Sequence, residues 1–314
     1  IERQRVKEQD KNERRHNFEP VESNLTEEQV KLEASRCLHC KNPKCVQGCP
    51  VNIQIPEFIQ AIKDGDLNKA GEIIRQTSML PSVCGRVCPQ ERQCEGNCIL
   101  GIKGEAVAIG ALERYVGDNT KAEMPEIKPS GKKVAVVGSG CAGMTAACDL
   151  RKEGHEVEVF EALHELGGVL RYGIPPFRLP RVVLDREIEN LKAMGVKFHK
   201  NVIVGKSITL KQLKEDGFDA IFICSGAGLP KMLNVAGENL NGVFSANEFL
   251  TRVNLMHAGQ PDSPTPLRVG TKAAIFGGGN VAMDAARTAV RVGFEEVYII
   301  YRRTEKELPA RLEE

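Results

Sequence analysis

The sequence lacks an appreciable net charge, because 43 lysine and arginine residues face 42 acidic ones and leave +1 at neutral pH. A polyanionic partner such as nucleic acid is therefore not indicated. No apolar run approaches the roughly 18 to 20 residues that span a bilayer, and the opening IERQRVKEQDKNERR lacks the apolar segment of a secretory signal. We expect a cytoplasmic protein that binds neither nucleic acid nor a membrane.

What the sequence does have is cysteine, and its cysteines are unevenly placed. Eight of the eleven lie between Cys37 and Cys98, and the other three are scattered among apolar residues further along. Because the cytosol keeps thiols reduced, disulfide bonds are a poor explanation for this density. We therefore expect metal centres within residues 37–98, and we interpret Cys141, Cys148 and Cys224 as small core residues.

The eight clustered cysteines form two sets. Residues 37–50 read C-x2-C-x4-C-x3-C-P, which differs by two residues from the bacterial ferredoxin run C-x2-C-x2-C-x3-C-P. Residues 84–98 add C-x3-C-P and then C-x3-C. In the ferredoxin run the fourth cysteine ligates the other cluster of a pair, so this pattern favours iron–sulfur clusters. Two zinc sites with four cysteine ligands each are the alternative.

Residues 1–125 are predicted to form a helical iron–sulfur domain. Thr26 and Gln29 have the spacing of a capping box, and Pro56 suits the first turn of a helix that ends at Gly65. The predicted helices are short and leave long cysteine-bearing loops, so metal centres would substitute for a large hydrophobic core. Residues 118–132, with two prolines and few apolar side chains, are the predicted linker.

The rest of the chain follows an α/β pattern that occurs twice. From Lys132 onward a strand, a glycine turn, a helix and a second strand indicate a βαβ unit, and the same order recurs from Lys272. We therefore predict two Rossmann-like nucleotide-binding domains, at residues 126–255 and 256–314, with FDAIFICSGAG as a further buried strand of the first. The second would be incomplete, because such a sheet normally has five or six strands. We expect the chain to be a fragment.

The first copy carries G-x-G-x-x-G at Gly138, Gly140 and Gly143, between a strand and a helix. The first two glycines permit a tight turn and a close approach of the backbone to a pyrophosphate, which the helix N-terminus favours. Glu161, at the end of the next strand, is placed to bind the hydroxyl pair of a ribose. The alternative is a glycine turn that serves packing alone.

The second copy reads G-x-G-x-x-A at residues 277–282, and Arg302 and Arg303 stand where the first copy has Glu161. Guanidinium groups bind a 2′-phosphate that a carboxylate repels, so this site is predicted to prefer NADP to NAD. A solvated strand end is the alternative. Residues 165–180, rich in glycine and proline, could approach a flat ring through their backbone. The first site is thus the better FAD candidate, although spacing alone leaves the reverse assignment open.

Five motifs resemble those of NADPH-dependent glutamate synthase small (beta) subunits. They are CLHCKNPKCVQGCPVNIQIPEFI, CGRVCPQERQCEGNC, AIGALERYVGD, YGIPPFRLP and GGGNVAMDAAR. The chain is also similar to the large subunit of the NADH-dependent reduced ferredoxin:NADP oxidoreductase and to the N-terminal half of dihydropyrimidine dehydrogenase. The resemblance covers almost the whole chain. It implies that NADPH passes a hydride to FAD, which sends single electrons through two 4Fe-4S clusters to a partner subunit.

The resemblance also implies which residues hold the nucleotides. For FAD they are Gly138, Ser139, Gly140, Cys141, Ala142, Glu161, Gly168, Val169, Arg178 and Val204. For NADPH they are Gly278, Gly279, Asn280, Val281, Arg302, Arg303 and Arg311. No protein side chain is predicted to act as an acid or base in hydride transfer, because the cofactors carry that chemistry.

For the clusters, the ferredoxin precedent and the resemblance together lead to one assignment. One 4Fe-4S cluster is predicted to be held by Cys37, Cys40, Cys45 and Cys98, and the other by Cys49, Cys88, Cys94 and Glu113. Glu113 stands where dihydropyrimidine dehydrogenase has a glutamine that ligates its cluster, and a carboxylate oxygen is a plausible iron ligand. Cys84 is the alternative eighth ligand.

The leading interpretation is an FAD- and iron–sulfur-dependent NADPH oxidoreductase of the glutamate synthase small-subunit type. Its partner would be the large subunit, which makes glutamate from 2-oxoglutarate and glutamine. The alternative is the large subunit of an electron-bifurcating NADH-dependent ferredoxin:NADP oxidoreductase, which has the same cofactors and a ferredoxin reductase-like partner. A third interpretation is a non-catalytic iron–sulfur scaffold that binds nucleotides without turnover.

Overall fold

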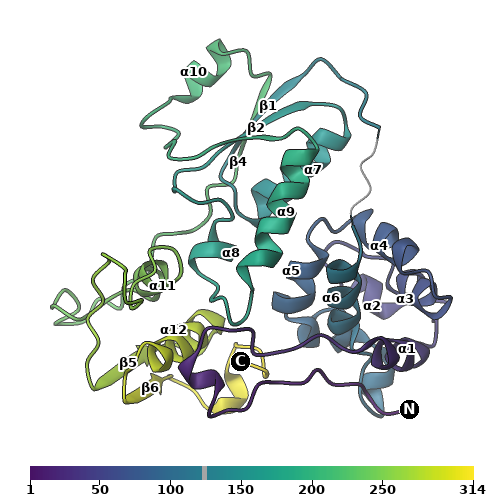
Figure 1. The fold of residues 1–314 in the computed structure, drawn as a ribbon, viewed down its shortest axis with the longest axis horizontal. Helices are drawn as coiled ribbons and strands as arrows, with labels where there is room; N and C mark the ends of the chain where they lie inside the picture. The colour runs from purple at the N-terminus through teal and green to yellow at the C-terminus, as the bar shows by residue number, and fades with distance from the viewer. Residues whose placement is uncertain (122–125) are drawn as a thin grey trace.

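The computed structural model describes residues 1–121 and 126–314. Figure 1 shows three parts: helices α1 to α6 on the right, a sheet with its helices at the top, and a smaller unit around α12 at the lower left. We call them the helical part, the first unit and the second unit. The predicted linker joins the helical part to the first unit, and its residues 122–125 lie outside the described residues.

The helical part is built from short helices, as the sequence predicts. They are α1 (Glu27–Ser35), α2 (Lys44–Gln47), α3 (Ile55–Lys63), α4 (Leu67–Arg75), α5 (Pro81–Val87) and α6 (Ile109–Asn119), with 3-10 turns η1 (Arg14–His16), η2 (Gln90–Arg92), η3 (Glu95–Asn97) and η4 (Ile99–Ile102). Thr26 and Gln29 form the predicted capping box, and Pro56 lies in the first turn of α3. The apolar faces of α1, α3, α4 and α6 share one core, against which cysteines of both sets pack.

The first unit contains a parallel sheet with the strand order β3-β2-β1-β4. Its strands are β1 (Lys133–Val137), β2 (Glu156–Phe160), β3 (Lys197–His199) and β4 (Ala220–Ile223), and its helices are α7 (Cys141–Lys152), α8 (Val169–Tyr172), α9 (Arg181–Ala193) and α10 (Leu210–Glu215). This strand order is that of a Rossmann-like sheet around its first βαβ crossover. The main core lies between the sheet and helices α7 and α9, and residues of the helical part extend it.

Strand β4 differs from the expectation of a buried strand. Phe222 is 43% exposed and Ile223 is 59% exposed. A continuous apolar run is typical of parallel strands that are covered on both faces. Within the described residues β4 pairs with β1 alone and forms the edge of the sheet, so the apolar side chains of its last two residues lack cover.

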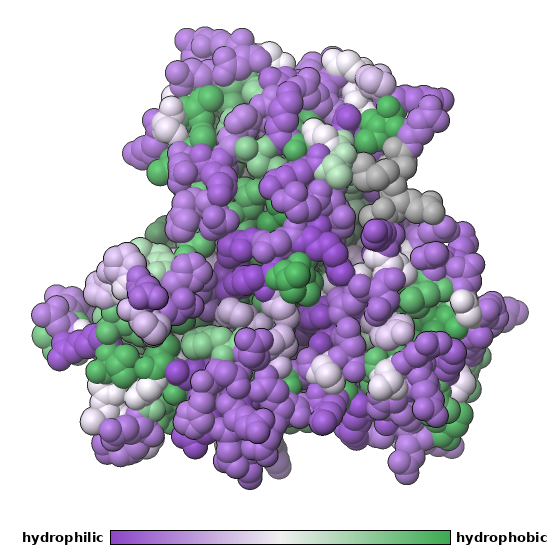
Figure 2. All heavy atoms as spheres, viewed as in Figure 1, coloured by the Kyte–Doolittle hydropathy of each residue, from purple (hydrophilic) through white to green (hydrophobic). Residues whose placement is uncertain are grey.

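The second unit repeats the strand-helix-strand order. Strands β5 (Lys272–Phe276) and β6 (Glu296–Ile300) pair in parallel on either side of α12 (Asn280–Arg291) in the sequence, and η5 (Glu305–Glu307) follows. Helix α11 (Ala246–Asn254) packs against both α8 and α12, so it contacts both units. Hydrophobic side chains reach the surface over this unit, at the lower left of Figure 2.

The N-terminal segment connects all three parts. Residues 7–23 form a loop closed by a bridge between Glu8 and Glu22, and in Figure 1 it runs from the helices to the second unit. The Val21 amide donates to the Phe177 carbonyl of the first unit at 3.0 Å. Arg291 of α12 donates through Nε to the Asn17 carbonyl at 2.8 Å. The helical part is therefore tied to both nucleotide-binding units.

Candidate cofactor sites

The first glycine loop has room on one side only. Gly138 has a φ of +109°, and a Cβ there would lie 2.6 Å from the Cys224 carbonyl oxygen. A Cβ on Gly143 would lie 2.0 Å from the Gly138 oxygen, so helix and strand approach too closely for any side chain. At Gly140 the nearest atom would be 3.9 Å away. The space beside Gly140, at the start of α7, suits a phosphate group.

Glu161 is bound to this loop by the protein itself. Its buried carboxylate accepts hydrogen bonds from the Ser139 amide at 2.9 Å, the Ser139 hydroxyl at 2.5 Å and the Leu163 amide at 2.9 Å. Ser139 Oγ in turn accepts from the Gly167 amide at 3.0 Å. Because each carboxylate oxygen can accept more than one hydrogen bond, the group retains capacity for a ribose hydroxyl.

The structure brings a second glycine pair to the same place. Gly168 has a φ of +54°, and a Cβ there would lie 2.8 Å from Gly140 Cα. Three groups of residues predicted to bind FAD are therefore neighbours. They are the first glycine loop, Glu161, and the pair Gly168 and Val169. The segment just before Val204 hydrogen-bonds the backbone of Glu161. Val204 itself packs against the hydrophobic cluster that contains Phe160.

The second glycine loop is partly covered by the chain that follows β6. Gly277 has a φ of +138°, and a Cβ on Gly278 would lie 2.6 Å from Leu308 and 2.8 Å from Tyr301. The Ala310 amide donates to the Gly278 carbonyl at 3.0 Å. Asn280 Oδ1, predicted to contact NADPH, accepts from the backbone amide of residue 311 at 2.9 Å. Gly279 and Val281 stand at the start of α12, and Val281 is exposed.

The three arginines predicted for NADPH fall into two groups. Arg302 and Arg303 are exposed immediately after β6, and neither makes an ion pair or hydrogen bond with any residue in 1–121 or 126–314. Their guanidinium groups are free to meet a phosphate. Arg311 is buried: it donates to the Arg86 carbonyl at 2.6 Å, lies 3.6 Å from a Glu91 oxygen and pairs with Glu313. Arg311 is thus used in holding the second unit to α5.

One cavity gathers half of the clustered cysteines. Its cysteine lining consists of Cys37, Cys40, Cys45 and Cys98, which is the set predicted for one cluster. Ile55, Ile59, Val107 and Ile109 form its apolar floor. Burial raises the pKa of Cys45 to about 11, and the neighbouring Cys98 and Cys37 contribute in the same direction. Thiols in such surroundings become good ligands only when a metal centre binds the thiolate.

The second set comes from four elements: Cys49 follows α2, Cys88 ends α5, Cys94 begins η3, and Glu113 lies in α6. Burial raises the pKa of Cys94 well above its usual value, and nearby Glu95, Glu113 and Cys49 act in the same direction. The pKa of Glu113 is also raised, first by burial and then by Cys84. Cys94 therefore lies near enough to Cys49 and Glu113 to feel their charges, and Glu113 is likewise near Cys84.

Comparison with known families decides what kind of chain this is. Residues 14–124 match the family model described as dihydropyrimidine dehydrogenase domain II, 4Fe-4S cluster. Residues 132–313, more than half of the chain, match the pyridine nucleotide-disulphide oxidoreductase family. The chain belongs to the pyridine nucleotide-disulphide oxidoreductases. The predicted order, a helical iron–sulfur region followed by an α/β oxidoreductase region, is confirmed.

Individual relatives of this oxidoreductase agree with the resemblance in its motifs. It is 38% identical to the glutamate synthase (NADPH) small chain of Escherichia coli strain K12, over 94% of this chain and 64% of that protein. It is 40% identical to the NADP(+)-dependent formate dehydrogenase subunit beta of Moorella thermoacetica, over 85% and 40%. With the NADPH-Fe(3+) oxidoreductase subunit beta of Geobacter sulfurreducens it shares 38%, over 85% and 39%. The chain spans less than two thirds of each relative.

The oxidoreductase has side chains that fit iron–sulfur clusters. Glu113 Oε1 is buried and has no hydrogen-bond partner among the described residues, and such an atom costs free energy unless a ligand meets it. Within residues 1–121 and 126–314, no three His, Cys, Asp or Glu side chains gather tightly enough to hold a single metal ion. The 4Fe-4S family match favours iron–sulfur clusters over the zinc alternative.

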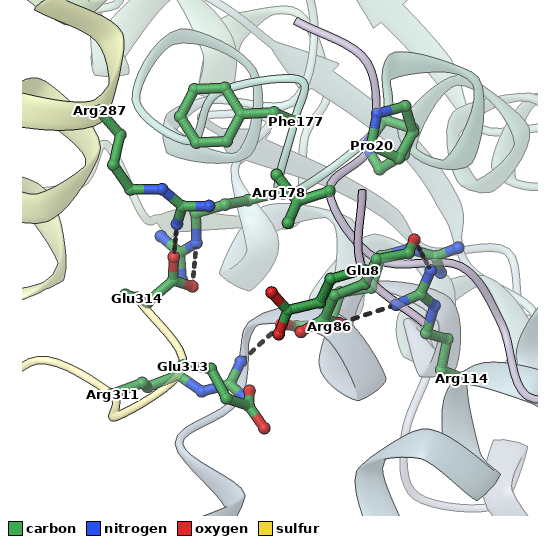
Figure 3. Close-up of a pocket in the computed structure, with 13 residues that line it drawn as sticks. Glu8, Pro20, Arg86, Arg114, Phe177, Arg178, Arg287, Arg311, Glu313 and Glu314 are labelled. Atoms are coloured by element: carbon green, nitrogen blue, oxygen red, sulfur yellow. Dashed lines mark hydrogen bonds and ion pairs between the residues drawn. The ribbon is translucent and has the colours of Figure 1, made fainter. Parts of the chain in front are cut away.

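Arg178 of the oxidoreductase, predicted to contact FAD, is engaged elsewhere. Its side chain donates to Asp284 of α12 at 2.7 Å and pairs with Glu314. Figure 3 shows Arg178 and Glu314 in a pocket lined by residues of all three parts. The charged residues that line it are Glu8, Glu22, Arg86, Arg114, Arg178, Arg287, Arg311, Glu313 and Glu314. Burial raises the pKa of Asp284 to about 7, although Arg178 acts in the opposite direction.

Sequence reasoning missed the α12 residues of this junction. The Phe177 ring lies 4.7 Å from the Arg287 guanidinium and 3.9 Å from that of Arg291, and it is almost fully buried. Asp284, Arg287 and Arg291 recur at helical spacing, so all three lie on one face of α12. That spacing was a usable signal, but three of their partners, Asn17, Phe177 and Arg178, stand more than 100 positions earlier in the sequence.

Among the described residues, none of the helices has both the length and the apolar character that a bilayer crossing requires. All eleven cysteines lie within the described residues, and none forms a disulfide.

Proposed function

We propose that this chain belongs to an NADPH-dependent oxidoreductase of the glutamate synthase small-chain type, which passes electrons through FAD and two 4Fe-4S clusters to a partner subunit. The observation that carries the proposal is the combination, in one chain, of two cysteine sets, a glycine loop with an acid and a second glycine loop with two unpaired arginines. When bound, FAD would turn a hydride into single electrons that iron–sulfur clusters can carry.

The first glycine loop is assigned to FAD. Gly138, Ser139, Gly140, Cys141 and Ala142 would bind the pyrophosphate through backbone amides, and Glu161 would bind the ribose. Support comes from the space at Gly140 and from the Gly168 backbone that faces it. Val169 and Val204 are proposed apolar contacts. The proposed role of Arg178 is changed to that of a residue that fixes the second unit against the first.

The second glycine loop is assigned to NADPH. Gly278, Gly279, Asn280 and Val281 would meet its pyrophosphate at the start of α12. Arg302 and Arg303 would bind the 2′-phosphate, because they are exposed and carry no carboxylate partner within the described residues. Arg311 would stabilise this loop by its hydrogen bond to α5.

The cluster assignment follows the two groups of side chains. Cys37, Cys40, Cys45 and Cys98 would hold the first cluster, around the cavity that they share. Cys49, Cys88, Cys94 and Glu113 would hold the second, which lies nearer the first unit because α5 packs into that unit's core. The second cluster would therefore receive electrons from the flavin, and the first would deliver them.

The surface near the first cavity supports an exit to a partner. Leu38 and Ile99 line the cavity and are 62% and 52% exposed, and Ile102 of the same turn as Ile99 is 76% exposed. The lysines of this region, Lys41, Lys44, Lys63 and Lys103, are exposed as well. We propose that an electron acceptor docks on this surface and that its own contact surface has an acidic rim. A reducing, cytoplasmic location agrees with the free thiols of all eleven cysteines.

Two experiments test the proposal. The full-length protein, purified without oxygen, should contain FAD and about eight irons, and it should reduce an artificial acceptor with NADPH much faster than with NADH. Absence of flavin or a preference for NADH would contradict it. Capture of the natural complex identifies the partner: an amidotransferase domain supports the glutamate synthase type, whereas a ferredoxin reductase with a 2Fe-2S site supports the bifurcating alternative.

A further inference from the structure

Two short elements each connect the two proposed cluster sites. Cys45 lies in α2, and Cys49 follows the end of that helix by two positions. Cys94 directly precedes η3, and Cys98 directly follows it. Cys45 and Cys98 line the first cavity, whereas Cys49 and Cys94 are proposed ligands of the second cluster. The two elements therefore run in opposite directions between the sites, and each carries one proposed ligand of either cluster.

The two elements touch at Gly48. Its φ of −79° and ψ of −10° lie in the right-handed helical region, which residues other than glycine adopt without strain. A Cβ there would nevertheless lie 2.5 Å from Asn97 Nδ2 and 2.7 Å from the Gln93 carbonyl oxygen. The second of these is a backbone atom, which cannot turn aside as a side chain can. The contact with η3, and not the backbone conformation, thus excludes a side chain at position 48.

The two residues that meet Gly48 stand directly before cysteines of different proposed clusters. Gln93 precedes Cys94, and Asn97 precedes Cys98. Asn97 Nδ2 donates to the Gln93 carbonyl at 2.7 Å and so joins the two ends of η3. A displacement of both residues at the contact with α2 would therefore move one ligand of each cluster.

Other contacts limit how far η3 could withdraw from α2. A Cβ on Gly96 would lie 2.4 Å from the Glu91 carbonyl oxygen, so η3 also lies against the backbone of η2. Glu95 Oε1 accepts from the Gly110 amide at the start of α6 at 2.9 Å. The other oxygen of this carboxylate pairs with Arg3 of the N-terminal segment at 2.7 Å. Because η3 is held by these neighbours, added bulk at the contact with α2 would be transmitted to the cysteines.

We propose that Gly48 and Asn97 are positioning residues shared by both clusters, whose contact holds α2 against η3 and fixes the ligand geometry of the two sites together. The inference rests on the proposed function, since it assumes that the assigned ligands hold two clusters. Groups that orient metal ligands affect metal affinity nearly as much as the ligands do. A change at this contact should therefore alter both clusters, whereas a change at a single ligand should alter the cluster that it holds.

The test compares variants of the full-length protein, purified without oxygen. Iron content, the EPR spectra of the reduced clusters and the rate of iron loss to a chelator are measured, and FAD content reports the folding of the first unit. Gly48→Ala should alter the EPR signals of both clusters. Loss of an orienting group typically costs about 10- to 100-fold in metal affinity, so we expect iron loss from both clusters to be about tenfold faster or more. Asn97→Ala, which adds no bulk, should cause smaller changes in the same two signals. Gly101→Ala is the matched control, because the nearest atom to a Cβ there would be 3.7 Å away.

A double variant separates this role from a general packing effect. Gly48→Ala combined with Asn97→Ala removes the contact with the asparagine side chain but keeps the contact with the Gln93 carbonyl. The signal of the first cluster, to which Cys98 is assigned, should return toward the wild type. The signal of the second cluster, to which Cys94 is assigned, should stay altered.

Several outcomes would overturn the inference and leave the proposed function intact. They are wild-type spectra in Gly48→Ala, a change confined to one cluster, equal changes in Gly101→Ala, and equal recovery of both clusters in the double variant. If Gly48→Ala loses its FAD as well as its iron, Asn97→Ala decides, and wild-type spectra and iron retention in that variant would overturn the inference. A wild-type protein without two clusters would contradict the proposed function itself.

Discussion

Arg178 and Asp284 form a buried ion pair across the boundary between the first and second units, with a distance of 2.7 Å between Nη1 and Oδ2. Both side chains are nearly inaccessible to solvent. Removing one partner of such a pair typically costs about 3–5 kcal/mol, and without Asp284 the buried Arg178 charge would keep only its ion pair with Glu314. We expect Asp284→Ala to lower the free energy of unfolding by about that amount in urea titrations. Lys272→Ala, which removes an exposed pair with Glu296, should cost about 1 kcal/mol or less. Equal effects would contradict the assignment.

The same carboxylate gives the junction a pH dependence. The pKa of Asp284 is about 7 in the folded protein, above its usual value, chiefly because of burial. Between about pH 4 and 7 the folded state therefore binds more protons than the unfolded state, and stability falls as the pH rises through this window. Asp284→Asn should remove this component. Parallel unfolding titrations of wild type and variant at several pH values measure it, and identical pH profiles would contradict the prediction.

Phe177 provides a second test of the junction. Its ring lies against Arg287, Arg291 and the Phe18 ring of the N-terminal segment. Phe177→Ala should lower the free energy of unfolding by about 3–5 kcal/mol, because it leaves a cavity and removes two cation–π contacts. Phe177→Leu should cost less. Limited proteolysis should then cut the N-terminal segment near Val21 sooner than in the wild-type protein. An unchanged digestion pattern would mean that Phe177 does not protect this segment from cleavage.

Arg302 is expected to select the nicotinamide cofactor. Loss of a hydrogen bond between charged groups costs roughly 1.5–3 kcal/mol, so Arg302→Ala should weaken NADPH binding about 10- to 150-fold and NADH binding far less. Lys306→Ala, another exposed cation of the same segment, serves as the matched control. Equal losses for both nucleotides would mean that Arg302 is structural.

Glu113 is expected to affect only one cluster. Glu113→Ala should change the EPR or Mössbauer signature of the second cluster and leave the first unchanged, because Cys94 of the second set lies near this carboxylate. Glu113→Gln, which retains an oxygen donor, should stay closer to the wild type. Two unchanged clusters in Glu113→Ala would contradict the ligand assignment.

The exposed turn beside the first cavity is expected to matter only to the partner. Ile102→Glu should weaken partner binding or partner reduction about tenfold or more, because it places an acid in the apolar patch. Reduction of a small artificial acceptor should be unchanged. Val182→Glu changes an apolar side chain on α9 that is 73% exposed and is the control. An equal effect of both substitutions would remove this surface from consideration.

The features that sequence predicted well are those that a few neighbouring residues determine. Gly138 and Gly143 are required by local backbone geometry. The capping box joins Thr26 and Gln29, which are only three positions apart. Glu161 was located by a fixed spacing from the glycine loop. The alternation of strand and helix follows from hydrophobic period alone.

What sequence could not supply are contacts between distant residues. Arg178 and Arg311 match family motifs, yet nothing local shows that they meet Asp284 and the Arg86 carbonyl. The exposure of β4 likewise depends on which segments pack over it. An apolar run predicts that a strand is buried, but it does not show which segment buries it. The contact between Gly48 and Asn97 becomes visible only when α2 and η3 are seen packed together.

The short segment from Leu308 to Arg311 has a thermodynamic consequence. Ala310 binds the second glycine loop through the Gly278 carbonyl, and the adjacent Arg311 holds the Arg86 carbonyl of α5, the helix that Cys88 terminates. Arg92 of the helical part also donates to the Leu308 carbonyl, at 3.0 Å. Any strain that a bound nucleotide places on this segment therefore reaches the cysteine region. By linkage, whatever free energy a nucleotide at the proposed second site contributes to a change in the cysteine region would be returned as an equal change in nucleotide affinity when that region changes.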